Sequence, residues 1–470
     1  MVVAPVRVSP YTSAALNRLF ACALCAAFAA CSSASTVGEP PEQQFYFPSG
    51  LTHVDVPGST EGALYVANGN FDKRYTHGTF VGINLDQVGL PAFGARVPET
   101  GPVQLTALPL PSTEGAEVIG DARVNIASFA GELGLWKRPN GELRFFVPSR
   151  SEGDYLQVID GPAPALNATP SLRCFTALKD TDDCWSAAYS MTAYQDPVTS
   201  LPRATAPYGV TVAPDGEVYV THLTNADSPR GSNKNLTSYI VHFNAETLQV
   251  DANSFVALGP GAVNTAVVGK KWVYLTGRAL TGGTQFVRLL NRTGSAVLGG
   301  GIEFTLGIVD ARGISLSSDE TRLYFAGRNP DRLVVASITG ADTDAPLVRV
   351  MRTVPLAAGP NQVITIPRPG RSDLVAVTCS TAGVLALYDD DLGGLVAQVQ
   401  GVGLQPFSIA ADQQGAGVRL YVSNFADGRV AVIDVPDLEA PQVARVVAHL
   451  SKDQLCLTRS ERETVKKVCP

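Results

Sequence analysis

The chain has 470 residues, of which 45% are hydrophobic and only 17% charged, and it contains 44 glycines and 32 prolines. That composition favours many short strands joined by tight turns over long helices. The formal net charge of −7, with no long run of basic residues, argues against a general nucleic-acid binder, because phosphate binding relies on clustered Lys and Arg.

Residues 1–30 are predicted to be an export signal peptide. Arg7 and Arg18 precede an apolar run over residues 19–30, which is too short to span a bilayer and ends in small residues. The last three residues of this run and the cysteine after them read FAAC. This tetrapeptide resembles the lipobox of bacterial lipoproteins.

The lipobox resemblance implies that the chain is cut before Cys31 and that the thiol of Cys31 is acylated. Ser32 and Ser33 follow, and no Asp stands directly after the cysteine, which by the sorting rule of the lipoprotein family points to the outer membrane. Residues 31–44 are then the lipidated cysteine and a flexible tether rich in Ser, Glu and Pro. An ordinary cleavable signal peptide with a chance cysteine is the alternative.

Seven apolar, strand-like runs of similar sequence follow. They begin at Leu64, Phe145, Val218, Val273, Leu323, Val375 and Leu420. The later spacings, of 55, 50, 52 and 45 residues, approach the period of about 40–50 residues that is typical of propeller blades. One such sheet cannot bury its own faces and must stack on copies of itself. The pattern therefore predicts an all-β fold, a seven-bladed β-propeller over residues 45–450.

The order of the predicted strands places an innermost strand first, over residues 50–56, and an outermost strand last, over residues 443–449. Residues 43–47 are the candidate for the pairing that closes the ring. Two insertions interrupt the repeats, at about residues 87–121 and 161–203.

The cysteines predict two local disulfides if the chain is exported to an oxidising compartment. Cys174 and Cys184 flank an acidic loop in the second insertion, and they are expected to close a solvated hairpin rather than a Ca²⁺ site. Cys456 and Cys469 are expected to close a charged C-terminal appendage over residues 451–470. Cys379 is left over within an apolar strand, which indicates a buried free thiol.

Two of the repeated runs carry a family resemblance. VYVTH, from Val218 to His222, and LYVSN, from Leu420 to Asn424, resemble the Tyr-Val-Thr-Asn strand of the YVTN-repeat β-propellers. The resemblance covers residues 45–450 and implies the propeller fold. It leaves the function open, because that family includes lactonase-like enzymes, cofactor-carrying domains and envelope proteins of unknown role.

In a propeller the first strands of the sheets line a central channel, so residues at their starts converge at its mouth. The aligned positions are Ser49, Arg123, Tyr208, Asn264, Arg312, Asn361 and Phe407. Arginines, amides and aromatic rings suit a small anionic or sugar-like ligand, because Arg supplies paired donors. Arg150, Arg278 and Arg328 each follow a second strand and are candidates to join this set. The alternative is a water-filled channel whose polar residues only satisfy strand ends.

The sequence contains no established catalytic motif. The five histidines lack His-x-x-x-His spacing, and neither a Cys-x-x-Cys-His haem motif nor a Gly-x-Ser-x-Gly elbow occurs. Lactonase-type propellers hold a metal with carboxylate and Asn ligands, whereas the seven mouth positions offer Asn264 and Asn361 but no carboxylate. No catalytic or metal-binding residue is therefore predicted, and no cofactor is assigned.

The sequence thus predicts an exported, lipid-anchored propeller that binds a ligand or protein, or acts as a scaffold, in the bacterial cell envelope. A lactonase-like or related hydrolase with its site at the channel mouth is the alternative, and it requires a metal-ligating or acid/base set in one region of that mouth. A redox-cofactor domain is less favoured because no attachment motif is found. The expected partners are the membrane, through the anchor, and an envelope protein or a small anionic or sugar-like ligand.

Overall fold

A computed structural model of the chain describes residues 38–452, except 42, 107, 109–121, 151–152, 167, 169, 176–183, 185–188, 191–204, 225–236, 279–286, 294–296 and 300–306. The predicted signal peptide, Cys31 and the Cys456–Cys469 pair lie outside the described residues. Among the described residues, no helix is both long and apolar enough to cross a bilayer.

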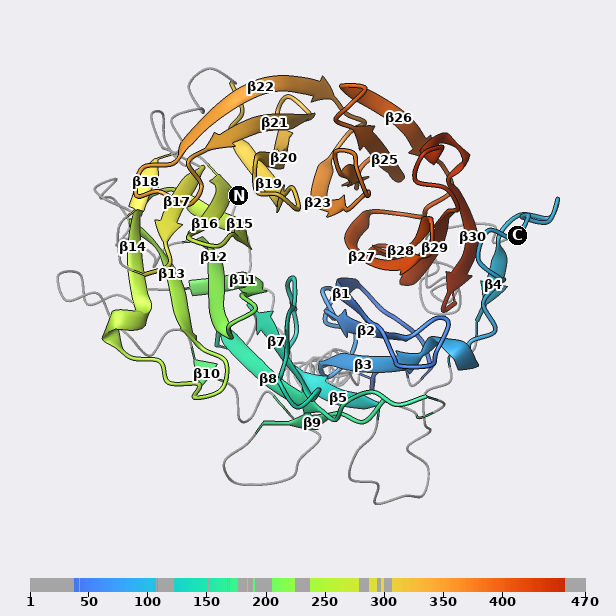
Figure 1. Ribbon diagram of the computed structural model, residues 1–470. Helices are drawn as coiled ribbons and strands as arrows, with labels where there is room; N and C mark the ends of the chain where they lie inside the picture. Colours follow the sequence, from blue (N-terminus) through green and yellow to red (C-terminus); the bar gives the residue numbers. More distant parts are fainter. Residues whose placement is uncertain are drawn as a thin grey trace, which may run out of the picture.

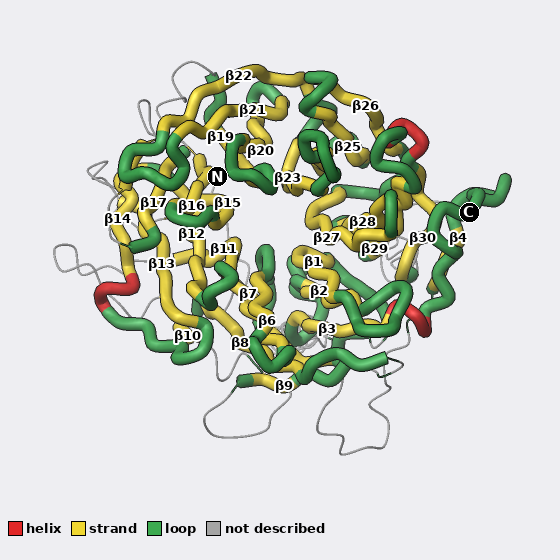
Figure 2. The backbone as a smooth tube through the Cα atoms, in the orientation of Figure 1, coloured by secondary structure: helices red, strands yellow, loops and turns green. Residues whose placement is uncertain are grey.

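The described chain is almost entirely β-structure, arranged as a ring of sheets around a central axis (Figure 1). Figure 2 shows the same ring as a tube, in which helical segments are few and short. In the described residues these segments are the 3-10 turns Leu85–Gln87, Ala252–Ser254 and Pro441–Val443. The arrangement is that of a β-propeller, as the sequence predicts.

Three sheets form the first part of the ring. The first sheet has the strand order β1-β2-β3-β5, the second β10-β8-β7-β6 with β9 beside β8, and the third β11-β12-β13-β14. Their strands are β1 (Pro48–Val54), β2 (Ala63–Asn68), β3 (Gly78–Asn84), β5 (Arg123–Ile126), β6 (Gly134–Lys137), β7 (Leu143–Ser149), β8 (Tyr155–Gly161), β9 (Arg173–Cys174), β10 (Tyr189–Ser190), β11 (Thr205–Val212), β12 (Glu217–Thr224), β13 (Thr237–Asn244) and β14 (Phe255–Pro260).

Three further sheets complete the ring: an eight-stranded double sheet of β15 to β22, the β23 sheet of β23 to β26, and the last sheet, ordered β27-β28-β29-β30-β4. Their strands are β15 (Ala262–Val268), β16 (Trp272–Arg278), β17 (Arg288–Asn291), β18 (Val297–Gly299), β19 (Asp310–Leu316), β20 (Arg322–Arg328), β21 (Arg332–Thr339), β22 (Leu347–Pro355), β23 (Pro360–Ile366), β24 (Leu374–Cys379), β25 (Val384–Asp389), β26 (Gly394–Val399), β27 (Pro406–Gln414), β28 (Gly417–Asn424), β29 (Arg429–Val435), β30 (Arg445–Leu450) and β4 (Val103–Leu105).

The double sheet makes the observed sheet count differ from the predicted blade count. Hydrogen bonding gives six sheets in the described chain, where the sequence predicts seven blades. The two halves of the double sheet, β15 to β18 and β19 to β22, are joined through the pair of Arg278 on β16 and Asp310 on β19.

Each of the seven apolar runs found in the sequence is the second strand of a four-stranded set. They are β2, β7, β12, β16, β20, β24 and β28. Every residue of β2, β24 and β28 is buried. These strands are apolar on both faces because each sheet is covered by a neighbour on either side, and each fully buried Val or Leu side chain contributes about 1.5–3 kcal/mol to folding.

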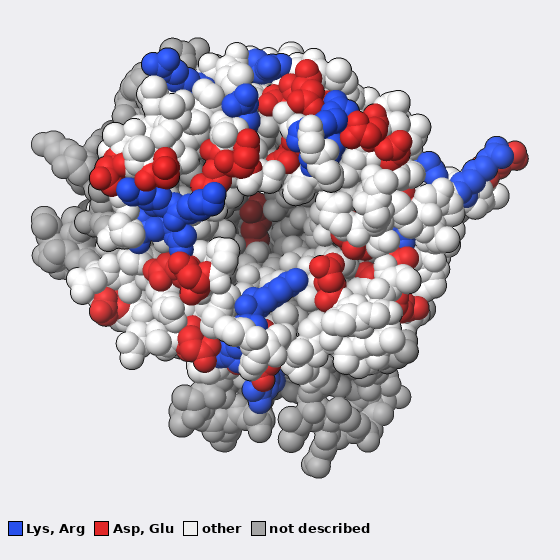
Figure 3. All heavy atoms as spheres, viewed as in Figure 1, with Lys and Arg blue, Asp and Glu red and all other residues white. Residues whose placement is uncertain are grey.

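The antiparallel pairing gives the ring two distinct edges. First strands start where second strands end, as shown by the pairs Pro48 with Asn68 and Pro406 with Asn424. We call this side the mouth edge, and we call the opposite side, which holds the turns between first and second strands, the turn edge. Figure 3 shows one face of the ring, hollowed at its centre, with acidic and basic side chains interspersed over that face.

The ring closes between the last sheet and the first. The closing strand is β4, which comes from the first insertion and pairs in parallel with β30. Gly94 N–H also donates to Asp434 at 2.8 Å, and Ser451 N–H donates to the Leu105 carbonyl at 2.9 Å. We call residues 85–105 the strap. The sequence suggested residues 43–47 for this role, but that segment forms no strand; Phe45 N–H donates to Ser451 Oγ at 2.8 Å, and the Phe45 side chain packs in the core at this seam.

Candidate functional site

Six of the seven predicted mouth positions lie at the mouth edge, on or beside the first strands. These six are Ser49, Tyr208, Asn264, Arg312, Asn361 and Phe407, on β1, β11, β15, β19, β23 and β27. Tyr208 and Phe407 face one another across the opening, with ring centroids 6.5 Å apart. These six positions therefore share one edge of the ring, and the chemistry of each is described below.

Arg123 is the exception. It lies on β5, the fourth strand of the first sheet, opposite Val81. The chain returns from the first insertion to complete the first sheet, so the first strand of the second sheet begins later, at Gly134. The spacing held a clue: Arg123 precedes Phe145 by 22 residues, whereas Tyr208 precedes Val218 by only 10.

Glu132 occupies the position that Arg123 was expected to fill. It forms a parallel bridge with Gly209 on the neighbouring first strand, and its N–H donates to the Tyr208 carbonyl at 2.8 Å. The approach is so close that a Cβ on Gly131 would lie 1.9 Å from the Tyr208 oxygen, so the position requires glycine. The sequence predicted no carboxylate among the mouth positions, and Glu132 is one.

The ionisation of Glu132 is perturbed. Although its side chain keeps some contact with solvent, burial within the channel raises the pKa of Glu132 to about 7, and the nearby Arg312 opposes this shift. A carboxyl group with a pKa near neutrality can hold or release a proton under physiological conditions.

The two mouth asparagines serve the framework. Asn264 is fully buried and donates through Nδ2 to Asp310 at 3.0 Å and to the Ala311 carbonyl at 2.6 Å. Asn361 donates to the Phe407 carbonyl at 3.2 Å. Each amide therefore joins its own first strand to the next one around the ring, and its donors are used within the protein.

Two mouth arginines are also held by hydrogen bonds within the protein. Arg312 donates through Nε and Nη2 to Asp310, with N···O distances of 2.9 and 2.8 Å. Arg328 donates to the Pro360 carbonyl at 2.7 Å and to Asn361 Oδ1 at 3.2 Å. Burial and repulsion from Arg312 lower the pKa of Arg328. Both guanidinium groups are oriented, but only Arg312 has a carboxylate partner.

Arg150, which follows β7, differs from both. Its guanidinium lies over the rings of Phe71 and Tyr208, 5.7 and 5.3 Å from their centroids. Within the described part of the chain its side chain makes no hydrogen bond or ion pair, and its Nε is buried without a partner. Burial lowers the pKa of Arg150, and repulsion from Arg312 adds to the effect. Asp154 opposes this shift through its charge, although the two side chains form no ion pair. A half-buried cation without a bonded carboxylate is costly for folding and is suited to receive an anion.

Five partly exposed phenylalanines at the mouth edge form a chain of ring contacts that reaches Arg150 through Phe71, and we call them the mouth phenylalanines. They are Phe47, Phe71, Phe129, Phe407 and Phe425. Phe71 is central, with ring centroids 4.9 Å from Phe129 and 4.7 Å from Phe425. Only one of the five was identified from the sequence, because the others lie in loops outside the aligned strand positions.

The turn edge presents a contrasting set of arginines. Three buried arginines each bind an aspartate at the end of a third strand with two hydrogen bonds, and each also donates to a backbone carbonyl of the next sheet or its insertion. The sets are Arg144 with Asp160 (2.7 and 2.9 Å) and Ala245, Arg368 with Asp389 (2.8 and 3.0 Å) and Leu438, and Arg419 with Asp434 (2.7 and 3.1 Å) and Pro91. We call them the brace arginines.

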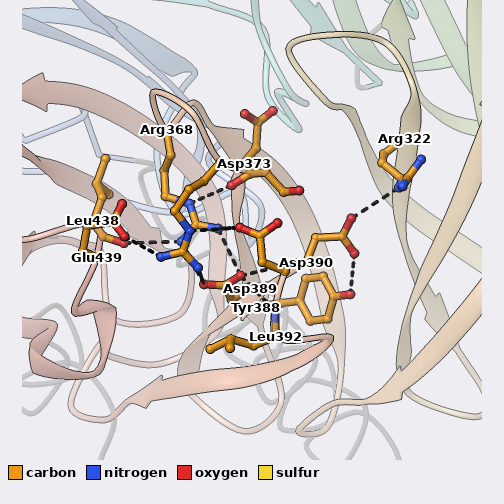
Figure 4. A network of polar contacts seen from close by, with 12 residues as sticks. Arg322, Arg368, Asp373, Tyr388, Asp389, Asp390, Leu392, Leu438 and Glu439 are labelled. Atoms are coloured by element: carbon orange, nitrogen blue, oxygen red, sulfur yellow. Dashed lines mark hydrogen bonds and ion pairs between the residues drawn. The ribbon is translucent and has the colours of Figure 1, made fainter.

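Figure 4 shows the brace around Arg368 and the polar groups beside it. Burial alone would raise the pKa of Asp389, but hydrogen bonds and charge from Arg368 hold it below its usual value. Nearby, Asp390 accepts from the Tyr388 hydroxyl at 2.7 Å and pairs with Arg322 at 3.3 Å. Arginine and aspartate are thus matched in this region of the turn edge.

One group of potential metal ligands lies at the turn edge. His53, Asp55 and Asp412 offer donor atoms within 4.8 Å of one another. His53 Nε2 is already 2.8 Å from the Glu61 carbonyl, and Asp55 is largely exposed. The group is remote from Arg150 and was not identified in the sequence.

The cysteines agree with the sequence where they are described. Cys174 and Cys184 form a disulfide, with Cα atoms 4.9 Å apart. Cys379 is a buried free thiol, as predicted, and burial raises its pKa to about 12.

No family model and no curated protein matches the chain. Among solved structures, Kuenenia stuttgartiensis hydrazine synthase is similar over 84% of this chain and 98% of that one, with 13% identity and a TM-score of 0.49. Pseudomonas aeruginosa periplasmic gluconolactonase, PpgL, is similar over 73% and 81%, with 14% identity and a TM-score of 0.41. The dihydro-haem d1 dehydrogenase NirN is similar over 71% and 59%, with 14% identity and a TM-score of 0.42. Likenesses of this degree carry no argument about function.

Proposed function

We propose that this chain is a binding module of the bacterial cell envelope that takes a small anionic ligand at the channel mouth. The observation that carries the proposal is Arg150, a guanidinium that lies over two aromatic rings, feels the charge of Asp154 and forms no ion pair with any described carboxylate. An anion arriving there gains charge-assisted hydrogen bonds, which are about twice as strong as neutral ones, and relieves the cost of the unpaired cation.

We also propose that the ring has seven blades of the YVTN-repeat type, with the double sheet counted as two blades. Seven hydrophobic clusters support this count, one at each junction between neighbouring four-stranded sets. One of the seven lies inside the double sheet, where Tyr274 of β16 packs with Phe325 of β20. The backbone pair between Arg278 and Asp310 joins the two halves at one point and leaves this packed junction between them.

Lipid anchoring at Cys31, with the outer membrane as destination, belongs to the same proposal. Gly38 is bridged to Tyr75 in the loop after β2, at the mouth edge. A lipid on Cys31, seven residues earlier, would hold this edge within about 25 Å of the bilayer, since a residue spans at most about 3.6 Å. Cys31→Ala should move the protein from the membrane to the soluble fraction, and retention in the membrane would contradict the anchor.

The test of the binding site is titration calorimetry with methanesulfonate, sulfate, phosphate and acetate. We expect at least one of these anions to bind the wild type and Arg150→Gln to lose that binding. Arg278→Gln is the matched control, because Arg278 follows a second strand at the same edge but is 45% exposed and lies 3.6 Å from Asp310. Equal losses in both variants, or binding retained in Arg150→Gln, would place the site elsewhere.

A hydrolase of the lactonase-like class is the second candidate, and Glu132 is the observation that favours it. Its pKa of about 7 suits a general acid or base, and the nearby Arg312 is a guanidinium of the kind that stabilises an oxyanion. A screen with sugar lactones and aryl esters tests this candidate. Turnover that Glu132→Gln abolishes, while the anion still binds, would favour an enzyme over a binding module.

A further inference from the structure

The mouth carries more apolar surface than a site for a bare anion needs. The five mouth phenylalanines keep part of their rings exposed, although they pack on one another around the opening. Apolar surface left in water costs about 25 cal/mol per Å², so a partly exposed ring cluster is stabilised by anything apolar that covers it. Such a patch at the mouth edge of the ring indicates a ligand with an apolar part.

The cations and the rings form one continuous surface. Phe71 contacts Arg150 on one side and two other mouth phenylalanines on the other, with Phe425 in turn 5.7 Å from Phe407. Lys73 and Arg74, from the same loop as Phe71, lie 5.5 Å over Phe129 and 5.7 Å over Phe47. Each of these cations therefore adjoins a ring face. Arg74 is already paired with Asp72, and a ligand that engages Arg150 also meets aromatic surface.

Two rings lie beside Arg150. Because Phe71 and Tyr208 lie within 5.7 and 5.3 Å of its guanidinium, an acidic group bonds to the N–H groups that these rings leave open. An acidic group bonded to those N–H groups places the rest of its molecule against the neighbouring rings. Planar groups fit best there, since aromatic pairs favour stacked or edge-on contacts at 4.5–7 Å.

We propose that the ligand is an amphipathic organic anion, with a carboxylate, sulfonate or phosphate on a flat aromatic or similarly apolar body. This inference rests on the anion-binding function proposed above and narrows it. A ligand of this kind differs from inorganic phosphate and simple sugars. Neither of these has an apolar face large enough to cover several phenylalanines.

Calorimetry with benzenesulfonate and methanesulfonate tests the inference, because the two share one acidic group and differ in the body. We expect benzenesulfonate to bind at least about tenfold more tightly, as burial of a phenyl ring implies. Phe71→Ala should reduce that preference to about threefold or less while methanesulfonate affinity changes little. Phe71→Leu, which keeps the bulk of the side chain, serves if the Ala variant fails to fold.

The outcomes separate the two proposals. Equal affinity for both sulfonates, with both lost in Arg150→Gln, would overturn the amphipathic ligand and leave the anion site standing. Binding of benzenesulfonate that survives Arg150→Gln would overturn the anion site, and an aromatic preference that survives both Phe71 variants would overturn the role of the rings. The absence of any sulfonate, phosphate or carboxylate binding to the wild type would overturn both.

Discussion

The two edges of the ring use arginine in opposite ways. At the turn edge, each of the three brace arginines is buried and bound to an aspartate, and each bridges to the next sheet or its insertion. At the mouth edge, Arg150 lies over two aromatic rings, and no carboxylate of the described residues is bonded to it. The same side chain stabilises the fold where its charge is matched and is available to a ligand where it is not.

The largest expected effect is the loss of a brace. Arg419→Met leaves the fully buried Asp434 without its counter-ion and removes the pairing to Glu61, so the free energy of unfolding should fall by about 3–5 kcal/mol. Urea unfolding followed by circular dichroism measures the change. Adding Asp434→Leu should recover most of the loss, and a fall below about 1 kcal/mol in the single variant would contradict the structural role.

An intermediate effect concerns pH at the mouth. Glu132, with a pKa of about 7, is neutral below that value and negative above it. Benzenesulfonate, whose own charge is constant, should bind more weakly above pH 8 than below pH 6, because ionised Glu132 adds a like charge to the same mouth. Glu132→Gln should remove this dependence, and an unchanged profile in that variant would assign the titration to another group.

The raised pKa of Glu132 also makes the free energy of unfolding depend on pH. The folded protein holds the Glu132 proton up to about pH 7, whereas an unfolded glutamate releases its proton near pH 4.5. Between those values the folded state binds more protons, so this group makes the protein less stable as pH rises. Glu132→Gln should flatten that part of the stability profile.

The smallest expected effect sharpens the contrast with the braces. Arg150→Met should leave the free energy of unfolding within about 1 kcal/mol of the wild-type value, because no bonded carboxylate loses its partner and Met keeps apolar contact with the rings. Denaturant unfolding beside Arg419→Met gives the comparison. A loss as large as that of the brace variant would show that Arg150 supports the fold rather than a ligand.

The sequence predicted features that depend on local patterns. The seven second strands are uninterrupted apolar runs, and Cys174 and Cys184 lie close enough in sequence to pair. Glu132 was missed because the length of an insertion does not reveal which sheet the returning chain completes. The mouth phenylalanines other than Phe407 were missed because loop residues do not align with the strand pattern.

The braces show the same limit more clearly. The sequence does show runs that end in aspartate, such as the one ending at Asp434, but not why they end in this way. The reason is an arginine on another strand or loop, such as Arg419, whose second contact lies on Pro91 in the strap. Such a contact depends on closure of the whole ring, and no pattern within one repeat contains it.

The strap also determines when the ring can close during folding. Val103 pairs with Ala448, so a segment synthesised early can be fixed in place only after nearly all of the remaining chain has been made. Until then the first sheet has one uncovered flank, with the apolar side chains of Leu64 and Val66 awaiting Tyr421 and Val432. The seam between the oldest and the newest parts of the chain is therefore the last step of assembly.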